Sequence, residues 1–314
     1  MNALIKPSLA ALAALLVTFN SEARAQMDVL SATGPCQLEL SGDGSIEWRG
    51  LYGRGYEVTG YESDFETISV TIRHEGEGCD FMLVATPNSG GENVLIGAGD
   101  RLYWDILSQP SGPSIVSSDF FGNQDRQLIG RFGPGGGAQP ITLFFTIPPG
   151  QFVRGGQYSG QALLRLFRVV DGAPELVSEL PFALIAPVPS ILQVRSDDFP
   201  GGVHEARIDL GDLSRPSRCS VNFDLISNAT IGVSFVSKNN GVLKHQFDAP
   251  GVPYDLRFNG SDLSLVGTAR QRLDMAAPDG SRAAQIEISV PPQRYALAAG
   301  RYTDSLTITF TADP

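Results

Sequence analysis

Two stretches decide the fold, ITLFFTIPPGQFVRGGQYSGQALLRLF at residues 141–167 and AQIEISVPPQRYALAAGRYTDSLTITF at residues 284–310. They repeat one pattern. Pro148-Pro149 of the first stretch matches Pro291-Pro292 of the second, and the tyrosines further along match after one inserted residue. A repeat spaced by about 140–150 residues indicates tandem domains and not a solenoid of short repeats.

The same register predicts the secondary structure of both stretches. The apolar residues of the second stretch alternate with threonines, which is the spacing of a β-strand. By composition alone QALLRLFRVV (161–170) could form a helix. Its alignment with a strand predicts instead that 161–167 is a strand. In this alignment the apolar positions Ala162, Leu164 and Leu166 correspond to Leu306, Ile308 and Phe310.

The rest of the chain is also typical of an all-β protein. Turn-forming residues recur every eight to twelve residues, and the runs between them, such as 68–72 and 286–290, alternate apolar and polar side chains. Two prolines at 187 and 189 discourage both helix and strand pairing, so we place a boundary there. We therefore expect an all-β fold of two tandem immunoglobulin-like β-sandwich domains, 26–188 and 189–314.

The first 25 residues have the features of a signal peptide. Lys6 precedes an apolar run from Leu9 to Phe19, and Ala23-Arg24-Ala25 fits the small-x-small pattern of a cleavage site. The apolar run is too short to span a bilayer, and no later stretch approaches the length that a membrane helix needs. We expect an exported chain that begins at Gln26 and has no membrane span.

Composition favours a globular protein and argues against nucleic-acid binding. The 314 residues are 42% hydrophobic and 18% charged, with a net charge of -11. A protein that tracks phosphates needs clustered lysine and arginine, whereas this chain has three lysines in all. We expect no nucleic-acid partner.

Export permits disulfides, and the chain has three cysteines. A bond between Cys36 and Cys79 closes a loop worth roughly 4 kcal/mol on a chain-entropy model, whereas a bond to Cys219 would cross the expected domain boundary. We predict a disulfide between Cys36 and Cys79. Cys219 is then a free thiol that behaves as a small buried apolar side chain on a strand.

The sequence contains no pattern of catalytic residues, and we predict no catalytic, cofactor-binding or metal-binding residue. His74, His204 and His245 are too far apart to form a metal-binding pair, and each is expected at the surface or in a loop. No nucleophile elbow or phosphate-binding loop occurs. Acidic pairs such as Asp197-Asp198 leave a periplasmic carbohydrate-active enzyme on a β-sandwich as one alternative function.

Aromatic residues gather among turn formers in the first half of the chain. Trp48, Tyr52, Tyr56, Tyr61 and Phe65 alternate with glycines, and they are either exposed binding residues or core residues on strands. Phe120 and Phe121 are neighbours flanked by turn formers, and neighbours on a strand would point in opposite directions. We predict that Phe120 and Phe121 form an adhesive loop.

The second half resembles a known family. GRYTDSLTITFTADP (300–314) and the preceding VPPQRYALAAG look like the C-terminal signature of the spore coat protein U domain family, which includes pilins and tip subunits of archaic chaperone-usher pili. Residues 208–213 before Cys219, Ser227-Asn228-Ala229, Leu243 and VPYDLRFNG (252–260) follow in the family's order. The family usually pairs an early cysteine with a later one, and this half has only Cys219.

The resemblance implies assembly by donor-strand complementation, in which a sandwich that lacks its last strand receives one from another chain. The implied partners are a periplasmic pilus chaperone, an outer-membrane usher and an adjacent subunit that donates a strand. The implied location is the periplasm during transit and then the cell surface as part of a fimbrium, or secretion. The side chains expected at the edge of the acceptor groove are Leu306, Ile308 and Phe310.

The position of the chain in a pilus follows from which half is complete, and we expect the second sandwich to be incomplete, lacking its last strand. Residues 174–185 are expected to close the first sandwich, with the side chains of Leu176, Leu180, Phe182 and Leu184 on one face. The segment 26–35 alternates apolar residues poorly and ends in Gly34-Pro35, so it is a poor donor strand. We expect a tip adhesin that mediates surface attachment or biofilm formation; a shaft pilin or secreted coat component of the same family is the alternative.

Overall fold

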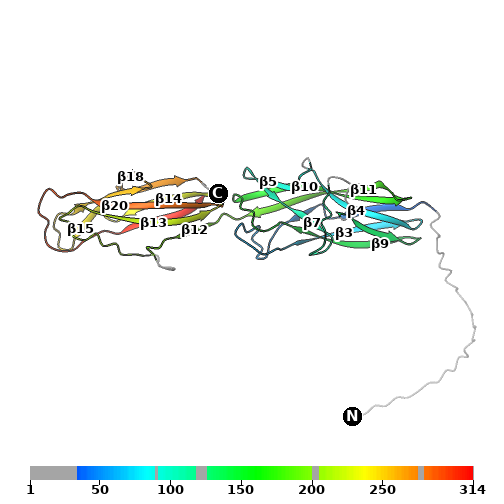
Figure 1. Ribbon diagram of the computed structural model, residues 1–314, viewed down its shortest axis with the longest axis horizontal. Helices are drawn as coiled ribbons and strands as arrows, with labels where there is room; N and C mark the ends of the chain where they lie inside the picture. Colours follow the sequence, from blue (N-terminus) through cyan, green and yellow to red (C-terminus); the bar gives the residue numbers. More distant parts are fainter. Residues whose placement is uncertain (1–33, 89–90, 118–125, 200–204, 275–278, 314) are drawn as a thin grey trace, which may run out of the picture.

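The computed structural model describes residues 34–88, 91–117, 126–199, 205–274 and 279–313. These residues form strands, turns and loops, as the sequence predicted. Figure 1 shows two strand-rich lobes end to end along the long axis, here called the N-terminal half (up to residue 188) and the C-terminal half (from 189). No helix in the described ranges could cross a membrane. The predicted signal peptide lies outside these ranges.

Two sheets enclose the core of the N-terminal half. The first has the order β1 (Gln37–Gly42), β3 (Glu66–Glu75), β9 (Gly137–Thr146) and β7 (Asp105–Leu107). The second has the order β2 (Ser45–Glu47), β11 (Ala173–Val188), β10 (Gly156–Val170), β4 (Cys79–Pro87) and β8 (Leu128–Phe132). The hairpin of β5 (Val94–Gly97) and β6 (Asp100–Tyr103) attaches to β10. Buried side chains from both sheets form one core, which includes Trp104, Phe145 and Tyr158.

The C-terminal half has a second, separate core between two further sheets. The first sheet has the order β12 (Leu192–Arg195), β13 (Ser217–Ser227), β20 (Ser281–Val290), β17 (Asp255–Phe258) and β18 (Ser261–Leu263). The second has the order β19 (Thr268–Leu273), β14 (Thr230–Ser237) and β22 (Leu306–Asp313). A small sheet is made of β16 (Val252–Pro253), β15 (Val242–His245) and β21 (Tyr302–Thr303).

The two halves share one strand plan, and the described C-terminal half lacks one strand of it. The order β1-β3-β9-β7 corresponds to β12-β13-β20-β17, and β9 and β20 carry the two copies of the sequence repeat. β10 and β22 also carry the repeat. β10 lies between β11 and β4, whereas β22 has β14 on one side and no described strand on the other. The C-terminal half therefore has no described counterpart of β11.

The hairpin between β10 and β11 supplies this strand in the N-terminal half. Its turn is Asp171-Gly172, with φ of 50° and 79°, and it connects the paired residues Val170 and Ala173. Two consecutive positive φ angles are the geometry of the tight turns that match strand twist, and Asp-Gly suits them. The strand predicted at 161–167 is thus confirmed as part of β10.

Two expectations about β11 were wrong in detail. A β-bulge at Val177 shifts the register, so Val177 packs against the core and Leu176 is 46% exposed, while Leu180, Phe182 and Leu184 face inward as predicted. The strand also continues through Pro187, where we expected pairing to stop. Proline keeps its carbonyl, and the Pro187 oxygen accepts a hydrogen bond from the Tyr56 backbone nitrogen (2.8 Å).

Asn228 connects the halves at the linker between β11 and β12. Its side chain is fully buried, its Oδ1 accepts a hydrogen bond from the Ile191 nitrogen (2.8 Å), and its Nδ2 donates to the Pro189 oxygen (3.0 Å). Its backbone carbonyl accepts from the nitrogen of Gly155 in the N-terminal half (3.0 Å). Ile191 packs against the N-terminal core. The linker is therefore held by both halves.

Replacing Asn228 with alanine should lower the free energy of unfolding by about 2–4 kcal/mol, because the N–H of Ile191 and the carbonyl of Pro189, both half-buried, lose their partner at about 1–3 kcal/mol each. Urea unfolding followed by circular dichroism measures this loss. Asn222→Ala is the matched control, since the exposed Asn222 side chain bonds only Gln285, and it should change stability by less than about 0.5 kcal/mol. Equal losses in the two variants would contradict the role of Asn228.

Alkaline pH should destabilise the fold between about pH 10 and pH 12. Burial, together with the charge of Asp100, raises the pKa of Tyr158 to about 12, whereas an unfolded tyrosine titrates near 10. Stability is complete below pH 10 and falls above it, because the unfolded chain loses its proton first. Urea titrations at several pH values measure the free energy of unfolding. In the Tyr158→Phe variant this free energy should fall less steeply with rising pH than in the wild type. A slope unchanged from that of the wild type would show that Tyr158 does not contribute.

Candidate functional site

β22 has one unpaired side along its whole length. It pairs antiparallel with β14 from Leu306 opposite Ser237 to Asp313 opposite Thr230. No other described strand pairs with it. A row of unpaired N–H and C=O groups on an edge strand is a template for an added strand.

A groove of about 2070 Å³ lies beside this unpaired edge. Its floor consists of core side chains from both strands of the central pair β13 and β20. Its two walls are β22 and residues of the ranges 194–199 and 205–214. The floor is therefore apolar and the wall formed by β22 offers free backbone groups. The floor residues are Val221, Phe223, Ile286 and Ile288. We call this feature the β22 groove.

The apolar side chains of β22 are less buried than their equivalents in β10. Ala162, Leu164 and Leu166 are 1%, 0% and 0% exposed, because β10 has a strand on each side. Leu306, Ile308 and Phe310 contact the C-terminal core but stay partly exposed along the groove. A strand beside β22 would complete their burial.

Residues of the ranges 196–199 and 205–214 line the opposite wall of the groove, and these two ranges form no strand. The ring of Phe199 lies 5.9 Å from that of Phe223, which in turn lies 5.3 Å from Phe310. Leu210 and Leu213 also pack against the core. Side chains of this segment thus cover part of the groove floor while the edge of β22 stays unpaired.

A polar network fixes the end of the groove where β22 begins. Asp304 Oδ2 accepts hydrogen bonds from the Tyr254 hydroxyl (2.7 Å) and the Ser237 hydroxyl (2.5 Å), and its Oδ1 accepts from the Asn239 nitrogen (3.0 Å). Burial, followed by the bond to Asp304, raises the pKa of Tyr254. The network joins the end of β14, the turn after it and the connection between β16 and β17 to Asp304, and so positions the segment that leads into β22.

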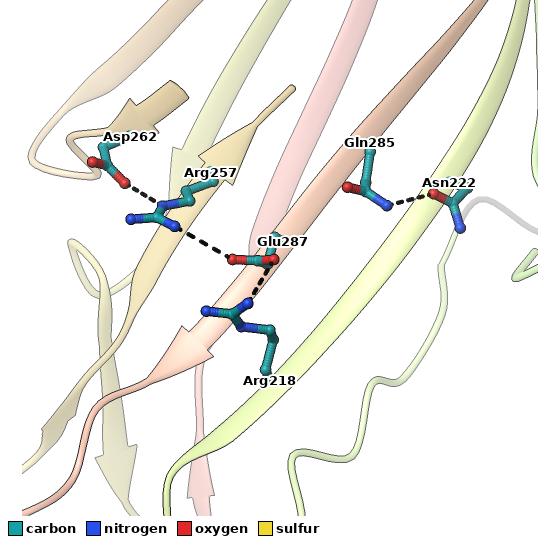
Figure 2. A network of polar contacts seen from close by, with 6 residues as sticks. All are labelled: Arg218, Asn222, Arg257, Asp262, Gln285 and Glu287. Carbon is teal, nitrogen blue, oxygen red and sulfur yellow. Dashed lines mark hydrogen bonds and ion pairs between the residues drawn. The ribbon is translucent and has the colours of Figure 1, made fainter. Parts of the chain in front are cut away.

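Figure 2 shows the opposite, outer face of the sheet that forms the floor. There Glu287 of β20 lies between Arg218 (3.5 Å) and Arg257 (3.9 Å), and Arg257 also bonds Asp262 (2.6 Å). These charged pairs alternate along the strands with the buried apolar residues. The sheet is therefore polar on the outside and apolar towards the groove.

The predicted aromatic and groove residues have different outcomes. Leu306, Ile308 and Phe310 line the β22 groove, and their role in accepting a strand stays a prediction. Phe120 and Phe121 lie outside the described residues. Of the earlier aromatic group, Trp48 and Tyr56 are core residues, Tyr52 and Tyr61 are exposed, and Phe65 is 39% exposed.

The cysteines pair as the sequence predicted. Cys36 and Cys79 form a disulfide with a Cα–Cα distance of 6.1 Å, and Cys219 is a free, half-buried thiol on β13. His74 lies close to both sulfur atoms. Because the sulfurs are bonded to each other, they are not available as thiolate metal ligands.

The expectation that His74 lies at the surface was wrong. His74 is on β3, is 2% exposed, and stacks on the ring of Phe132 at 4.8 Å. Its Nε2 makes a hydrogen bond of 2.8 Å with the Glu77 carbonyl. This local carbonyl satisfies the ring, so an imidazole can occupy a core position on the strand. His245 ends β15 beside Tyr302, and His204 is not among the described residues.

The sequence matches no known family model and no curated relative. Several solved structures are similar. One is the archaic chaperone-usher Csu tip adhesion subunit of Acinetobacter baumannii in its pre-assembly complex with a chaperone (TM-score 0.38, 14% identity, 88% of this chain and 99% of that one). Another is the CupB6 tip adhesin from Pseudomonas aeruginosa (TM-score 0.46, 15% identity, 88% and 93%). A third is a mutant of the CFA/I adhesin CfaE of enterotoxigenic E. coli (TM-score 0.36, 16% identity, 88% and 82%).

Alkylation of the unreduced, unfolded chain should label Cys219 alone, and alkylation after reduction should label all three cysteines. Peptide mass spectrometry identifies the labelled sites. Replacing both Cys36 and Cys79 with alanine should cost about 2–5 kcal/mol of stability. Cys219→Ala is the control and should cost far less, because its half-buried thiol is small. A cross-link that includes Cys219 would contradict the pairing.

Proposed function

We propose that this protein is the tip adhesin of an archaic chaperone-usher pilus and that its β22 groove accepts a strand from another chain. The observation that carries the proposal is a difference between equivalent strands: among the described residues, β10 is paired on both sides and β22 pairs with β14 alone. Strand addition gives affinity through backbone hydrogen bonds and gives specificity through alternate side chains that enter pockets. The groove offers both an unpaired backbone and an apolar floor.

The number of apolar side chains that a donor strand buries in the groove determines the free energy of binding. A donor that buries about five apolar side chains, at about 1.5–3 kcal/mol each, gains on the order of 7–15 kcal/mol. This is comparable to the total stability of a typical domain. A chain with an open groove of this kind needs an escort before assembly, because an exposed edge strand also invites aggregation.

The two halves then have different roles. Residues 26–188 are the adhesin domain, which already holds its closing strand β11, and residues 189–314 are the pilin domain that joins the pilus. The exposed rings of Tyr52 and Tyr61 support a contact role for the adhesin domain, and Phe120 and Phe121 are proposed as its adhesive loop. The proposed partners are a periplasmic chaperone, an outer-membrane usher and an adjacent subunit that donates a strand. The proposed location is the cell surface, reached through the periplasm.

A donor strand joined to the full chain after residue 314 tests the groove. The added peptide has the length of β22, 8 residues, alternates valine with threonine, and follows a Gly-containing turn. It should raise the unfolding temperature of the C-terminal half by on the order of 10 °C or more, because burial of its valines adds several kcal/mol. Differential scanning calorimetry measures the shift.

Two controls separate strand insertion from a general effect of the tail. A peptide of the same composition without alternation should give little shift. Ile308→Asp should abolish the gain because the Ile308 side chain packs against the core beneath the groove. Thr309→Asp should preserve it because Thr309 touches only the rim of the groove, where its side chain is exposed and alternates with Ile308. Equal behaviour of the two aspartate variants, or no shift with the alternating peptide, would overturn the proposed strand acceptance.

A further inference from the structure

The N-terminal half contains a small polar pocket at the edge of its first sheet, where residues 113–115 bond to β7. The pocket has a volume of about 210 Å³, room for roughly seven water molecules at about 30 Å³ each. Asn93, Asp105, Ser114 and Arg126 contribute polar groups to its lining. It is formed entirely by the N-terminal half and is separate from the β22 groove.

One carboxylate oxygen of Asp105 accepts hydrogen bonds from the protein, and the other accepts none from the described residues. Its Oδ1 accepts hydrogen bonds from the Ile106 nitrogen (2.8 Å) and the Ser114 hydroxyl (2.5 Å). The Ser114 oxygen is itself held by the Val116 nitrogen (3.1 Å). No hydrogen bond to Oδ2 occurs among the described residues. Burial raises the pKa of Asp105, while the hydrogen bonds from Ser114 and Ile106 and the charge of Arg126 act in the opposite direction.

Asn93 and Arg126 complete the set of polar groups. The Asn93 amide nitrogen donates to the Trp104 carbonyl, so its amide oxygen is left as an acceptor. The exposed Arg126 donates one N–H to the Val116 carbonyl (3.5 Å) and has further N–H groups to offer. In the described structure Arg126 and Asp105 line the same pocket without an ion pair, which leaves space for a ligand between them.

The sequence repeat shows that the pocket is an addition to the shared strand plan. Asp105 opens β7 and pairs with Thr146, while Asp255 opens β17 and pairs with Ser289. Thr146 and Ser289 are aligned in the repeat, so the two aspartates are structural equivalents. Asp255 is exposed, and the connection that follows its strand is shorter. The fold therefore does not require the half-buried carboxylate that Asp105 provides at this position.

The chemistry of the lining selects the class of ligand. A calcium ion takes six to eight oxygen ligands, whereas this pocket holds one carboxylate and faces a guanidinium. An anion would meet the carboxylate of Asp105. A sugar ring carries neighbouring hydroxyls, each of which can donate and accept a hydrogen bond. This matches the acceptors Asp105 Oδ2 and Asn93 Oδ1 beside the donor Arg126.

We propose that this pocket binds a saccharide unit, with two neighbouring hydroxyls donating to Asp105 Oδ2 and Asn93 Oδ1 and one of them accepting from Arg126. Asp105 and Arg126 act as the binding residues, and Ser114 holds Asp105 in position. The inference is independent of strand acceptance at β22. It adds a specific ligand site to an N-terminal half whose aromatic residues alone suggest only non-specific attachment.

The test uses the full exported chain and free sugars as probes: D-glucose, D-galactose, D-mannose and N-acetyl-D-glucosamine. Saturation-transfer NMR should detect binding of at least one sugar, and calorimetry gives its dissociation constant. Asp105→Asn and Arg126→Gln should each weaken that binding at least about tenfold, since each removes a charge-assisted hydrogen bond. Asp255→Asn, the equivalent change in the C-terminal half, should leave it unchanged.

The remaining outcomes are also decisive. Glycine and glutamate serve as zwitterionic probes, and binding of these without any sugar would overturn the saccharide assignment. Failure of every sugar to bind, or equal effects of Asp105→Asn and Asp255→Asn, would overturn it too. If Asp105→Asn does not fold, Arg126→Gln decides, because this exposed side chain can be changed with little effect on the fold. None of these results alters the calorimetry of the β22 groove.

Discussion

The backbone of β22 has hydrogen-bonded neighbours on one side, and the organisation of the C-terminal half depends on that fact. An unpaired edge strand beside an apolar surface readily pairs with a strand of another chain. The surrounding structure leaves the unpaired edge of β22 accessible to another strand from one side. Charged pairs around Glu287 cover the outer face of the floor sheet, and the Asp304 network holds the start of β22. The unpaired edge of β22 is therefore reached through the β22 groove, whose floor is apolar.

The N-terminal half meets the same constraint within its own chain. The Asp171-Gly172 turn reverses the chain after β10, and β11 pairs along β10 up to Val188. The carbonyls at the end of β11 are then occupied by the segment around Tyr56. Beyond this strand the chain passes directly into the joint held by Asn228. The strand that closes one sandwich therefore also leads into the contact between the two halves.

The repeat explains how much of this the sequence could predict. Threonine alternation at 306–311 identified a strand, and the alignment carried that assignment to 161–167, where composition was ambiguous. The groove residues Leu306, Ile308 and Phe310 were expected from the family resemblance and not from the alignment. Details that depend on a single backbone choice were not predictable. A bulge at Val177 rotates Leu176 outward, and Pro187 stays in its strand because only its carbonyl is needed there.

The pocket at Asp105 was missed for a different reason. Strand pattern predicts which side of a sheet a residue faces, and by that rule Asp105 and Asp255 are both outward-facing and equivalent. What distinguishes them is tertiary: Ser114, in the connection after β7, bonds the Asp105 carboxylate. The alternation of apolar and polar residues along a strand does not predict such a tertiary hydrogen bond. The two halves thus depart from their shared plan in opposite ways. The C-terminal half lacks a described strand beside β22, whereas residues 113–115 of the N-terminal half bond to the edge of β7. Comparing equivalent positions across the repeat locates both sites, because the shared fold accounts for everything that the two halves have in common.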